Sequence, residues 1–431
     1  MKLTAKKRAT LGVALLTAAA LALTACGTSG PGGGSTGNAS AWALTGQQKT
    51  IQASFDTWNA ANTGKKVDVQ FFGNDAYKQK IRTAIGSGSS PTLIWTWGGG
   101  VLKSYVDANK LVPLDSSLTA KVFPAIAANG EVDGKLYAVP NNTVQPALIY
   151  FNKDVMAKAG LTGAPTTWDE LLSDVKTLRA QGIAPFSLGG ASKWPELMWL
   201  EYLTDRIGGP TPFKAIQDGE AGAWSNPSVI QALTMIQQLV DAGGFVDGFQ
   251  SVATDSSADF ALMYTGKAAM ILQGAWGYAA IQTAAPDFIS ANTLGWGDFP
   301  TVTGGTGDAS NVVGNASNYW SISADASKDQ QTTAAGYLTG GNMTDTYIAG
   351  LLSSGGVPPI TGLDAQIAKS ANASFLTDVY QMSENAANFT LSWDQAIDPS
   401  AADALLTNLD LVFLKQSTPQ QFADAMTAAS K

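Results

Sequence analysis

Apolar runs of strand length alternate with helical stripes of apolar residues along most of the chain. Ile51, Phe55 and Trp58 recur at helical spacing and predict a helix over residues 46–62. The same pattern predicts strands over 67–71, 93–97, 183–188 and 294–300, and helices over 75–85, 101–108, 375–386, 401–414 and 418–429. Strands that alternate with helices indicate an α/β fold with a mainly parallel sheet.

The stretch 137–154 breaks this alternation. Two apolar strands, over 136–139 and 147–151, flank Pro140 and the polar run 141–145. A central strand rarely carries prolines and amides, so we interpret this stretch as a crossover between two lobes whose amides face a cleft. Two further irregular passages occur near 301–311 and 355–361. Together the three predict a chain that passes between two lobes three times, with ordinary surface loops as the alternative.

The first 25 residues have the layout of a signal peptide. Four basic residues precede the apolar run 11–23, which is shorter than the roughly 20 residues that span a bilayer. The run ends in Leu-Thr-Ala-Cys-Gly at 23–27, which resembles the lipobox of bacterial lipoproteins. The resemblance implies cleavage before Cys26 and a lipid on its thiol, whereas a plain secretory signal is the alternative. Residues 26–40 would then be the lipidated cysteine and a Gly/Ser-rich flexible tether.

Composition excludes several kinds of chemistry. The chain has no histidine and a single cysteine, which excludes histidine acid/base catalysis, thiol catalysis in the mature fold, internal disulfides and ordinary zinc sites. Without the first 25 residues, 22 basic residues face 34 acidic ones, a net charge of −12. No basic cluster follows residue 10, so nucleic acid is not an expected partner. We expect no cofactor and no metal.

Several segments together resemble the extracellular solute-binding proteins of carbohydrate ABC importers, in the maltose-binding-like group. They are SGSSPTLIWTW at 87–97, GKLYAVPNNTVQPALIYFNKDVMAKAGL at 134–161, APTTWDELL at 164–172, FALMYTGKAAMILQGAW at 260–276 and VPPITG at 357–362. Their order and spacing match the family across almost the whole mature chain. One departure is Pro91-Thr92-Leu93, where the family usually has Pro-Asp-Val.

The resemblance implies the two-lobed periplasmic-binding-protein-like fold of type II, an α/β fold with a ligand cleft between the lobes. The N-lobe would comprise 41–141 plus 309–354, and the C-lobe 146–304 plus 360–431. The three hinge segments would lie near 141–146, 304–309 and 354–360. Lobe closure around a ligand is an established mode for such proteins.

A sugar site needs flat aromatic rings for the C–H faces of the sugar, and amides or carboxylates for its hydroxyl groups. Trp276 and Trp97 each follow a predicted strand beside glycines, and Trp393 precedes a C-terminal helix. We expect these three rings in the cleft, although each could be a core tryptophan. The expected polar ligand contacts are Asn74, Asn142, Gln145, Lys193, Asn315, Asn318 and Asp394. For each of these, a turn or cap role is the alternative.

The expected function is that of an extracellular binding protein that delivers a short oligosaccharide to a membrane permease. Segments 189–209 and 391–414 resemble the xylobiose-binding type, so the expected sugar is β-linked and xylobiose-like. Chitobiose, cello- or malto-oligosaccharides, or a polyol, are the alternatives. The expected protein is a monomer, not an enzyme, and is lipid-anchored at the outer face of the cell membrane. A glycoside hydrolase would need paired carboxylates, for which Asp394, Asp398 and Glu196 are the candidates.

Overall fold

The computed structural model describes residues 37–430. The expected signal peptide 1–25, the expected lipidation site Cys26 and most of the expected tether lie outside the described residues. The first strand, β1 (Ala39–Leu44), begins inside the range 26–40 that we expected to be tether. Its backbone pairs with β2 from Ala39 onward, which places the last two tether positions in the sheet.

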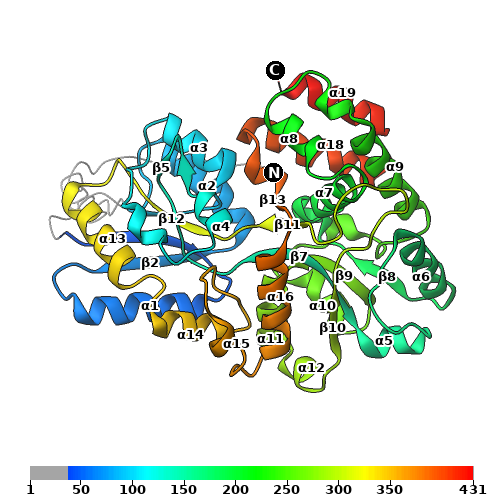
Figure 1. The fold of residues 1–431 in the computed structure, drawn as a ribbon, viewed down its shortest axis with the longest axis horizontal. Helices are drawn as coiled ribbons and strands as arrows, with labels where there is room; N and C mark the ends of the chain where they lie inside the picture. The colour runs from blue at the N-terminus through cyan, green and yellow to red at the C-terminus, as the bar shows by residue number, and fades with distance from the viewer. Residues whose placement is uncertain (1–36, 431) are drawn as a thin grey trace, which may run out of the picture.

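One five-stranded sheet forms the core of the first lobe, on the left of Figure 1. Its strand order is β2 (Val67–Phe72), β1, β3 (Leu93–Thr96), β12 (Tyr319–Ile322) and β6 (Val139–Pro140). β1 runs parallel to β2 and β3, whereas β12 runs antiparallel to β3 and β6. The helices of this lobe are α1 (Gln48–Ala61), α2 (Asn74–Gly86), α3 (Gly99–Asp107), α4 (Pro124–Ala128), α13 (Lys328–Gly340) and α14 (Asp345–Ser353), and a small hairpin joins β4 (Glu131–Val132) to β5 (Lys135–Leu136).

The second lobe is built on a six-stranded sheet around β7 (Gln145–Asn152), every residue of which is buried. The sheet order is β13 (Phe389–Leu391), β11 (Val312–Asn315), β7, β9 (Ala268–Gly274) and β8 (Ala184–Ser187), and β10 (Leu294–Gly297) also pairs with β7. The helices before the second crossing are α5 (Lys153–Lys158), α6 (Trp168–Ala180), α7 (Trp194–Gly208), α8 (Thr211–Gln217), α9 (Pro227–Asp241), α10 (Ala258–Tyr264), α11 (Trp276–Ala284) and α12 (Pro286–Ser290). The later ones are α16 (Ala373–Asn385), α17 (Trp393–Ala396), α18 (Pro399–Phe413) and α19 (Pro419–Ala429), and the short helix α15 (Asp364–Ile367) lies in the segment that leads from the first lobe to α16.

Both sheets are mixed, whereas the sequence pattern indicated mainly parallel pairing. β7 is antiparallel to β9, β10 and β11, and β12 is antiparallel to both of its neighbours. The antiparallel pairing follows from the path of the chain into β7 and β12. β7 and β12 enter their sheets directly from the other lobe, without the crossover helix that parallel neighbours require.

The chain passes between the lobes at points that differ in part from the expected hinge. It leaves β6 and enters β7 through 141–144. It returns through 316–318, not near 304–309, because 312–314 pairs with β13 in the second sheet. The third passage also lies later than the expected 354–360, because 359 and 361 hydrogen-bond with 121–123 of the first lobe.

Candidate functional site

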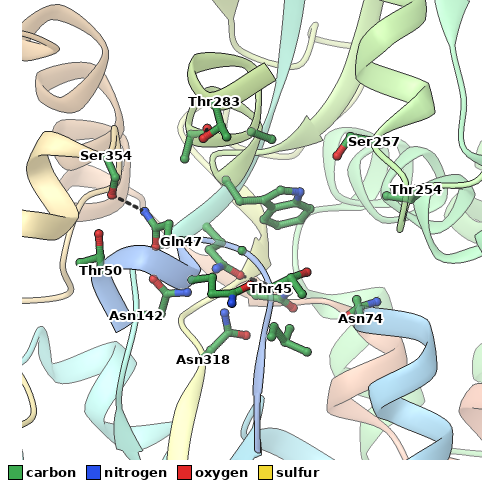
Figure 2. Close-up of a pocket in the computed structure, with 18 of the residues that line it drawn as sticks. Thr45, Gln47, Thr50, Asn74, Asn142, Thr254, Ser257, Thr283, Asn318 and Ser354 are labelled. Atoms are coloured by element: carbon green, nitrogen blue, oxygen red, sulfur yellow. Dashed lines mark hydrogen bonds between the residues drawn. The ribbon is translucent and has the colours of Figure 1, made fainter. Parts of the chain in front are cut away.

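A cavity of about 1290 Å³ lies between the two lobes, where strands β3, β7 and β11 reach the crossing segments. Side chains of both lobes line it (Figure 2). Eight of the ten side chains expected to bind ligand are among them: Asn74, Trp97, Asn142, Gln145, Trp276, Asn315, Asn318 and Asp394. The structure therefore brings together residues from six separate stretches of the chain.

Trp276 begins helix α11 directly after strand β9, and its ring lines the cavity. The ring lies over Gly274, where an added Cβ would stand 1.8 Å from the indole carbon Cζ3. Only glycine leaves room for this ring position. Trp194 packs against Trp276 with ring centroids 5.8 Å apart and an interplanar angle of 58°. The two rings form an angled apolar surface of the kind on which a sugar face can lie.

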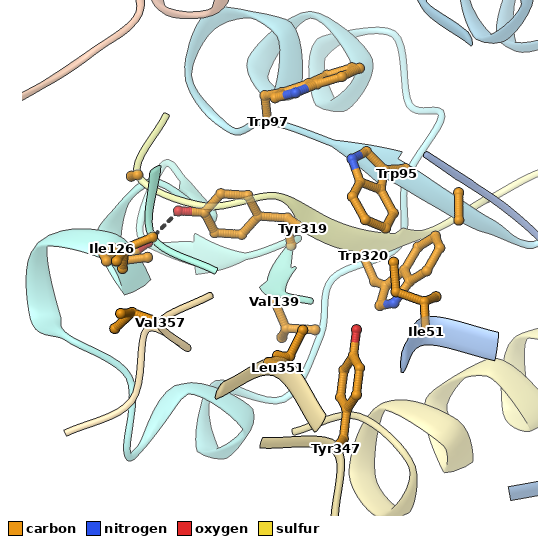
Figure 3. Close-up of a cluster of buried hydrophobic side chains, with 14 of the residues drawn as sticks. Ile51, Trp95, Trp97, Ile126, Val139, Tyr319, Trp320, Tyr347, Leu351 and Val357 are labelled. Carbon is orange, nitrogen blue, oxygen red and sulfur yellow. Dashed lines mark hydrogen bonds between the residues drawn. The ribbon is translucent and has the colours of Figure 1, made fainter. Parts of the chain in front are cut away.

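Trp97 and Trp95 come from the end of strand β3, in the opposite lobe (Figure 3). Both rings are almost fully buried, yet both border the cavity. Trp95 packs edge-to-face on Trp320 at 5.1 Å, which fixes its orientation. The Lys78 ammonium lies 5.4 Å from the centroid of the Trp97 ring. A cation over the ring of Trp97 holds that side chain at the cavity wall.

Lys78 also forms an ion pair with Asp394, with Nζ and Oδ2 3.1 Å apart. The two side chains are 27% and 7% exposed, so this pair is better shielded from water than an ordinary surface pair. The Gln395 amide donates to the same Asp394 oxygen at 2.7 Å. Because α2 and α17 belong to different lobes, the ion pair holds the lobes together at one end of the cavity.

Four amide side chains on the crossing segments form the floor of the cavity. Gln145 and Asn315 face each other across the β7–β11 pairing, and their side chains approach at 3.5 Å. Asn142 and Asn318 lie on the first and second crossings and are 5% and 3% exposed. Within 37–430, the side-chain oxygens of Asn142, Asn315 and Asn318 accept no hydrogen bond from the protein. Buried polar atoms without partners are costly, so these oxygens are suited to receive hydroxyl donors from a ligand.

The side of the cavity beside α2 is bounded by a contact between α2 and the loop 254–257. The Asp75 backbone N–H lies 3.2 Å from each carboxylate oxygen of Asp255, which belongs to the second lobe. The Asp75 carboxylate in turn accepts hydrogen bonds from the Trp194 indole at 3.2 Å and the Asn74 amide at 3.0 Å. Asn74 thus lies at a junction between the lobes as well as in the cavity lining.

Two expected ligand contacts lie outside the cavity lining. Trp393 is 1% exposed and stacks on Phe213 at 4.4 Å, within the core of the second lobe. Lys193 precedes α7 at a φ of 60°, and its ammonium lies 3.4 Å from the Asp410 carboxylate. Trp393 is a core residue because the short helix α17 directs it inward, whereas its neighbour Asp394 points to the cavity.

The cavity also contains side chains that sequence reasoning missed. Trp95 lies within the predicted strand 93–97 and Trp194 within the segment 189–209, and neither is among the expected ligand contacts. The loop 254–257 has the polar sequence Thr-Asp-Ser-Ser, which is a usable signal for a cleft loop. Further missed residues are Gln47, Lys78, Ser354, Ser392 and Gln395. Lys78 and Gln47 lie in helix-forming sequence, so nothing in the local pattern distinguishes them from solvent-facing positions.

The carboxylates considered for hydrolysis do not converge. Glu196 is fully buried, and burial, with Asp410 nearby, raises its pKa to about 9. Hydrogen bonds from the side chain and backbone of Ser400 lower the pKa of Asp398, which caps α18. Of the three candidates, only Asp394 lines the cavity, and it is paired with Lys78. Glu196 and Asp398 lie outside the cavity lining, so these three candidates do not form the pair of carboxylates that hydrolysis requires.

Within 37–430, no cluster of three or more His, Cys, Asp or Glu side chains is positioned to ligate a metal ion. The described helices include none with the length and apolarity that a bilayer crossing requires.

Solved structures share this fold over nearly the whole chain. One, from a study of xylan utilization by the thermophilic bacterium Caldanaerobius polysaccharolyticus, has a TM-score of 0.77 and 26% identity, and covers 91% of this chain and 99% of that one. A chitin oligosaccharide binding protein has a TM-score of 0.80 at 21% identity, with 91% and 98% coverage. These likenesses establish the two-lobed α/β fold.

Sequence relatives cover shorter stretches. A probable sugar-binding periplasmic protein from Mesorhizobium japonicum is 26% identical over 238 residues, which is 52% of this chain and 55% of that protein. An uncharacterized ABC transporter extracellular-binding protein from Pyrococcus horikoshii is 28% identical over 204 residues, 46% and 45% of the two chains. The chain thus spans about half the length of the curated relatives it matches.

The profile of one family matches residues 16–339, which is more than half of the chain. Its members are binding proteins rather than enzymes. The chain belongs to the family of bacterial extracellular solute-binding proteins.

Proposed function

We propose that this protein is the extracytoplasmic binding component of a carbohydrate ABC importer. It captures a short β-linked oligosaccharide of the xylobiose type by lobe closure and delivers it to the permease. The observation that carries this proposal is the interlobe cavity, which combines tryptophan rings with buried amide oxygens that accept no hydrogen bond from the described residues. The structural similarity to a protein from a xylan-utilization study supports the choice of xylo-oligosaccharide.

The apolar and polar side chains of the cavity would contact different parts of an uncharged sugar. Trp276 and Trp194 offer apolar faces to the C–H surface of a ring. Asn142, Asn315 and Asn318 supply acceptors for hydroxyl groups, and each net hydrogen bond contributes about 0.5–1.5 kcal/mol. Several such bonds with stacked rings suffice for a micromolar dissociation constant, which requires about −8 kcal/mol.

The hinge follows from the observed crossings. We propose that 141–144, 316–318 and 362–372 bend when the lobes open, with the first sheet in one lobe and the second sheet in the other. Asn142 and Asn318 lie within these segments, so the ligand would contact the hinge itself. Closure around sugar then produces the shape that a permease recognises.

Isothermal titration of the mature chain with xylobiose, cellobiose, chitobiose and maltose tests the sugar assignment. We expect xylobiose to bind at micromolar concentration or tighter and the others more weakly. Tighter binding of chitobiose or another disaccharide would keep the transport role and change the ligand. Absence of binding by all four below about 1 mM, or about −4 kcal/mol, would refute the proposal.

The location is a separate part of the proposal. We propose that Cys26 carries a lipid that anchors the monomer at the outer face of the cell membrane. Replacing Cys26 by serine should release the protein from the membrane fraction into the medium. Retention of the Cys26→Ser variant in the membrane fraction would contradict the anchor, and light scattering of the released form would test the monomer.

A further inference from the structure

The cavity continues well beyond the tryptophan rings. Part of its lining comes from three helices, and we call this part the outer groove. Its residues are Gln52, Ala53 and Asp56 of α1, Ala280, Thr283 and Ala284 of α11, and Gly350 and Ser353 of α14. In Figure 2, Gln47, Thr50, Thr283 and Ser354 gather on one side of the cavity, away from Asn74 and Thr254. The cavity therefore runs from the rings towards the α1–α11 side of the molecule.

The opposite end of the cavity is closed by the ion pair between Lys78 and Asp394. Beyond this pair lies a separate cavity of about 250 Å³, and Lys78, Trp97, Asp394 and Gln395 line both spaces. A chain of sugars that fills the ring-lined part thus meets a wall at one end. At the other end it meets the outer groove.

The outer groove has the chemistry of a hydroxyl-binding surface. None of its lining residues is aromatic, and its polar groups are mainly amides and hydroxyls. Three alanines, Ala53, Ala280 and Ala284, leave the groove unobstructed. At its inner edge the Gln47 amide donates to Ser354 Oγ at 3.2 Å, while Gln47 Oε1 is buried and accepts no hydrogen bond within 37–430.

The dimensions also exceed the needs of a disaccharide. The whole cavity, at about 1290 Å³, is larger than the roughly 300–1,000 Å³ pockets that enclose drug-sized ligands. The lining follows α1 from Gln48 to Asp56, and nine residues of helix are about 14 Å long. This length leaves room for further sugar units beside those stacked on the rings.

We propose that the outer groove binds additional units of an oligosaccharide whose first units occupy the ring-lined cavity. The protein then prefers chains of three or more units to a disaccharide. This inference rests on the proposed function, because it concerns how the same sugar site selects chain length. The outer units are held by hydrogen bonds without stacking.

Isothermal titration with xylobiose, xylotriose and xylotetraose tests the preference, with the cello-oligosaccharide series in parallel. We expect the tetrasaccharide to bind at least tenfold more tightly than the disaccharide of the same series. Equal affinities across a series would overturn the inference while leaving the proposed function intact. If no saccharide of any length binds, the proposed function itself fails and the inference fails with it.

Two variants test whether the outer groove causes the preference for longer chains. Ala53→Trp on α1 and Ala284→Trp on α11 should each reduce tetrasaccharide affinity to that of the disaccharide, and leave disaccharide affinity within twofold. Ala428→Trp, at an exposed position of α19, is the matched control and should change neither. Equal losses for both chain lengths would overturn the inference, because the bulky side chain would then act on lobe closure. Thermal unfolding of each variant shows that the comparison is made on folded protein.

Discussion

Asp255 offers a test of how the lobes are held together. Helix α2 begins after Gly73, and no side chain of the first lobe caps it. The Asp255 carboxylate, from the second lobe, fills that role by accepting the Asp75 N–H, and an added Cβ at Gly73 would come within 2.7 Å of Asp255 Oδ2. The carboxylate also lies at the positive end of the helix dipole. This cap exists only while the lobes are together, so its loss should weaken closure.

The expected magnitude follows from helix capping. Loss of an N-cap side chain costs about 0.5–2 kcal/mol, typically about 1 kcal/mol. Asp255 is exposed and its two contacts are both 3.2 Å, so a value of about 1 kcal/mol is appropriate. Since about 1.4 kcal/mol corresponds to tenfold, Asp255→Ala should weaken sugar binding about fivefold. Asp255→Asn keeps an acceptor and should lose about half of that free energy.

Titration calorimetry gives the affinities, and small-angle scattering gives the closed fraction with and without sugar. Asp424→Ala removes an exposed carboxylate from α19, away from the cleft, and should leave both quantities unchanged. Wild-type affinity in Asp255→Ala would refute the capping argument. So would weaker binding with an unchanged closed fraction, because Asp255 would then act on the sugar directly.

Four further changes test other parts of the molecule. Trp276→Ala should weaken sugar binding by more than tenfold in calorimetry, as loss of a buried aromatic contact typically costs about 2 kcal/mol or more. Trp393→Phe should lower the melting temperature and leave the affinity for sugar unchanged. Loss of affinity in Trp393→Phe, or loss of stability alone in Trp276→Ala, would contradict the assignment of Trp276 to the cleft and Trp393 to the core. Gln145→Ala should weaken binding at least tenfold with an unaltered circular dichroism spectrum, and unchanged affinity would reduce the first crossing to a plain linker. Burial raises the pKa of Glu196 to about 9, so the folded state retains a proton that the unfolded state releases, and stability should fall between about pH 4.5 and 9. In this range the free energy of unfolding, measured with denaturant, should fall with pH less steeply in Glu196→Gln than in the wild type, by about 1.4 kcal/mol per pH unit. Equal pH dependence in the two proteins would show that Glu196 is ionised in the folded state.

The amides of the cleft could be predicted because they interrupt apolar runs in the sequence. Asn142 and Gln145 sit between two apolar runs in a stretch that cannot continue as a central strand. The same holds for Asn315 and Asn318, which separate β11 from β12. Because these amides interrupt the apolar runs, local pattern alone pointed to four side chains that the structure brings together at the cavity.

Lys193 and Trp393 show where local pattern is insufficient. Both sit next to a residue that lines the cavity, Trp194 and Asp394 respectively. Trp393 and Asp394 are neighbours on α17, where successive side chains point about 100° apart, so only one of them faces the cavity, whereas Lys193 precedes α7 and does not share the helical geometry of Trp194. Periodicity predicts that a helix is present, but its rotation about its axis is set by tertiary packing, here by the stacking of Trp393 on Phe213.

The second crossing links the proposed hinge to the proposed ligand contacts. Asn315 is bound into the second sheet through its pairing with Gln145, while the Asn318 carbonyl accepts the Asn141 N–H at 2.8 Å beside the first sheet. Only two residues, Ala316 and Ser317, therefore join an amide held by one lobe to an amide held by the other. A sugar bonded to both amides would fix the distance between them, and with it the angle of the hinge. The geometry thus allows ligand contact at the floor of the cavity to bias closure without a separate signalling element.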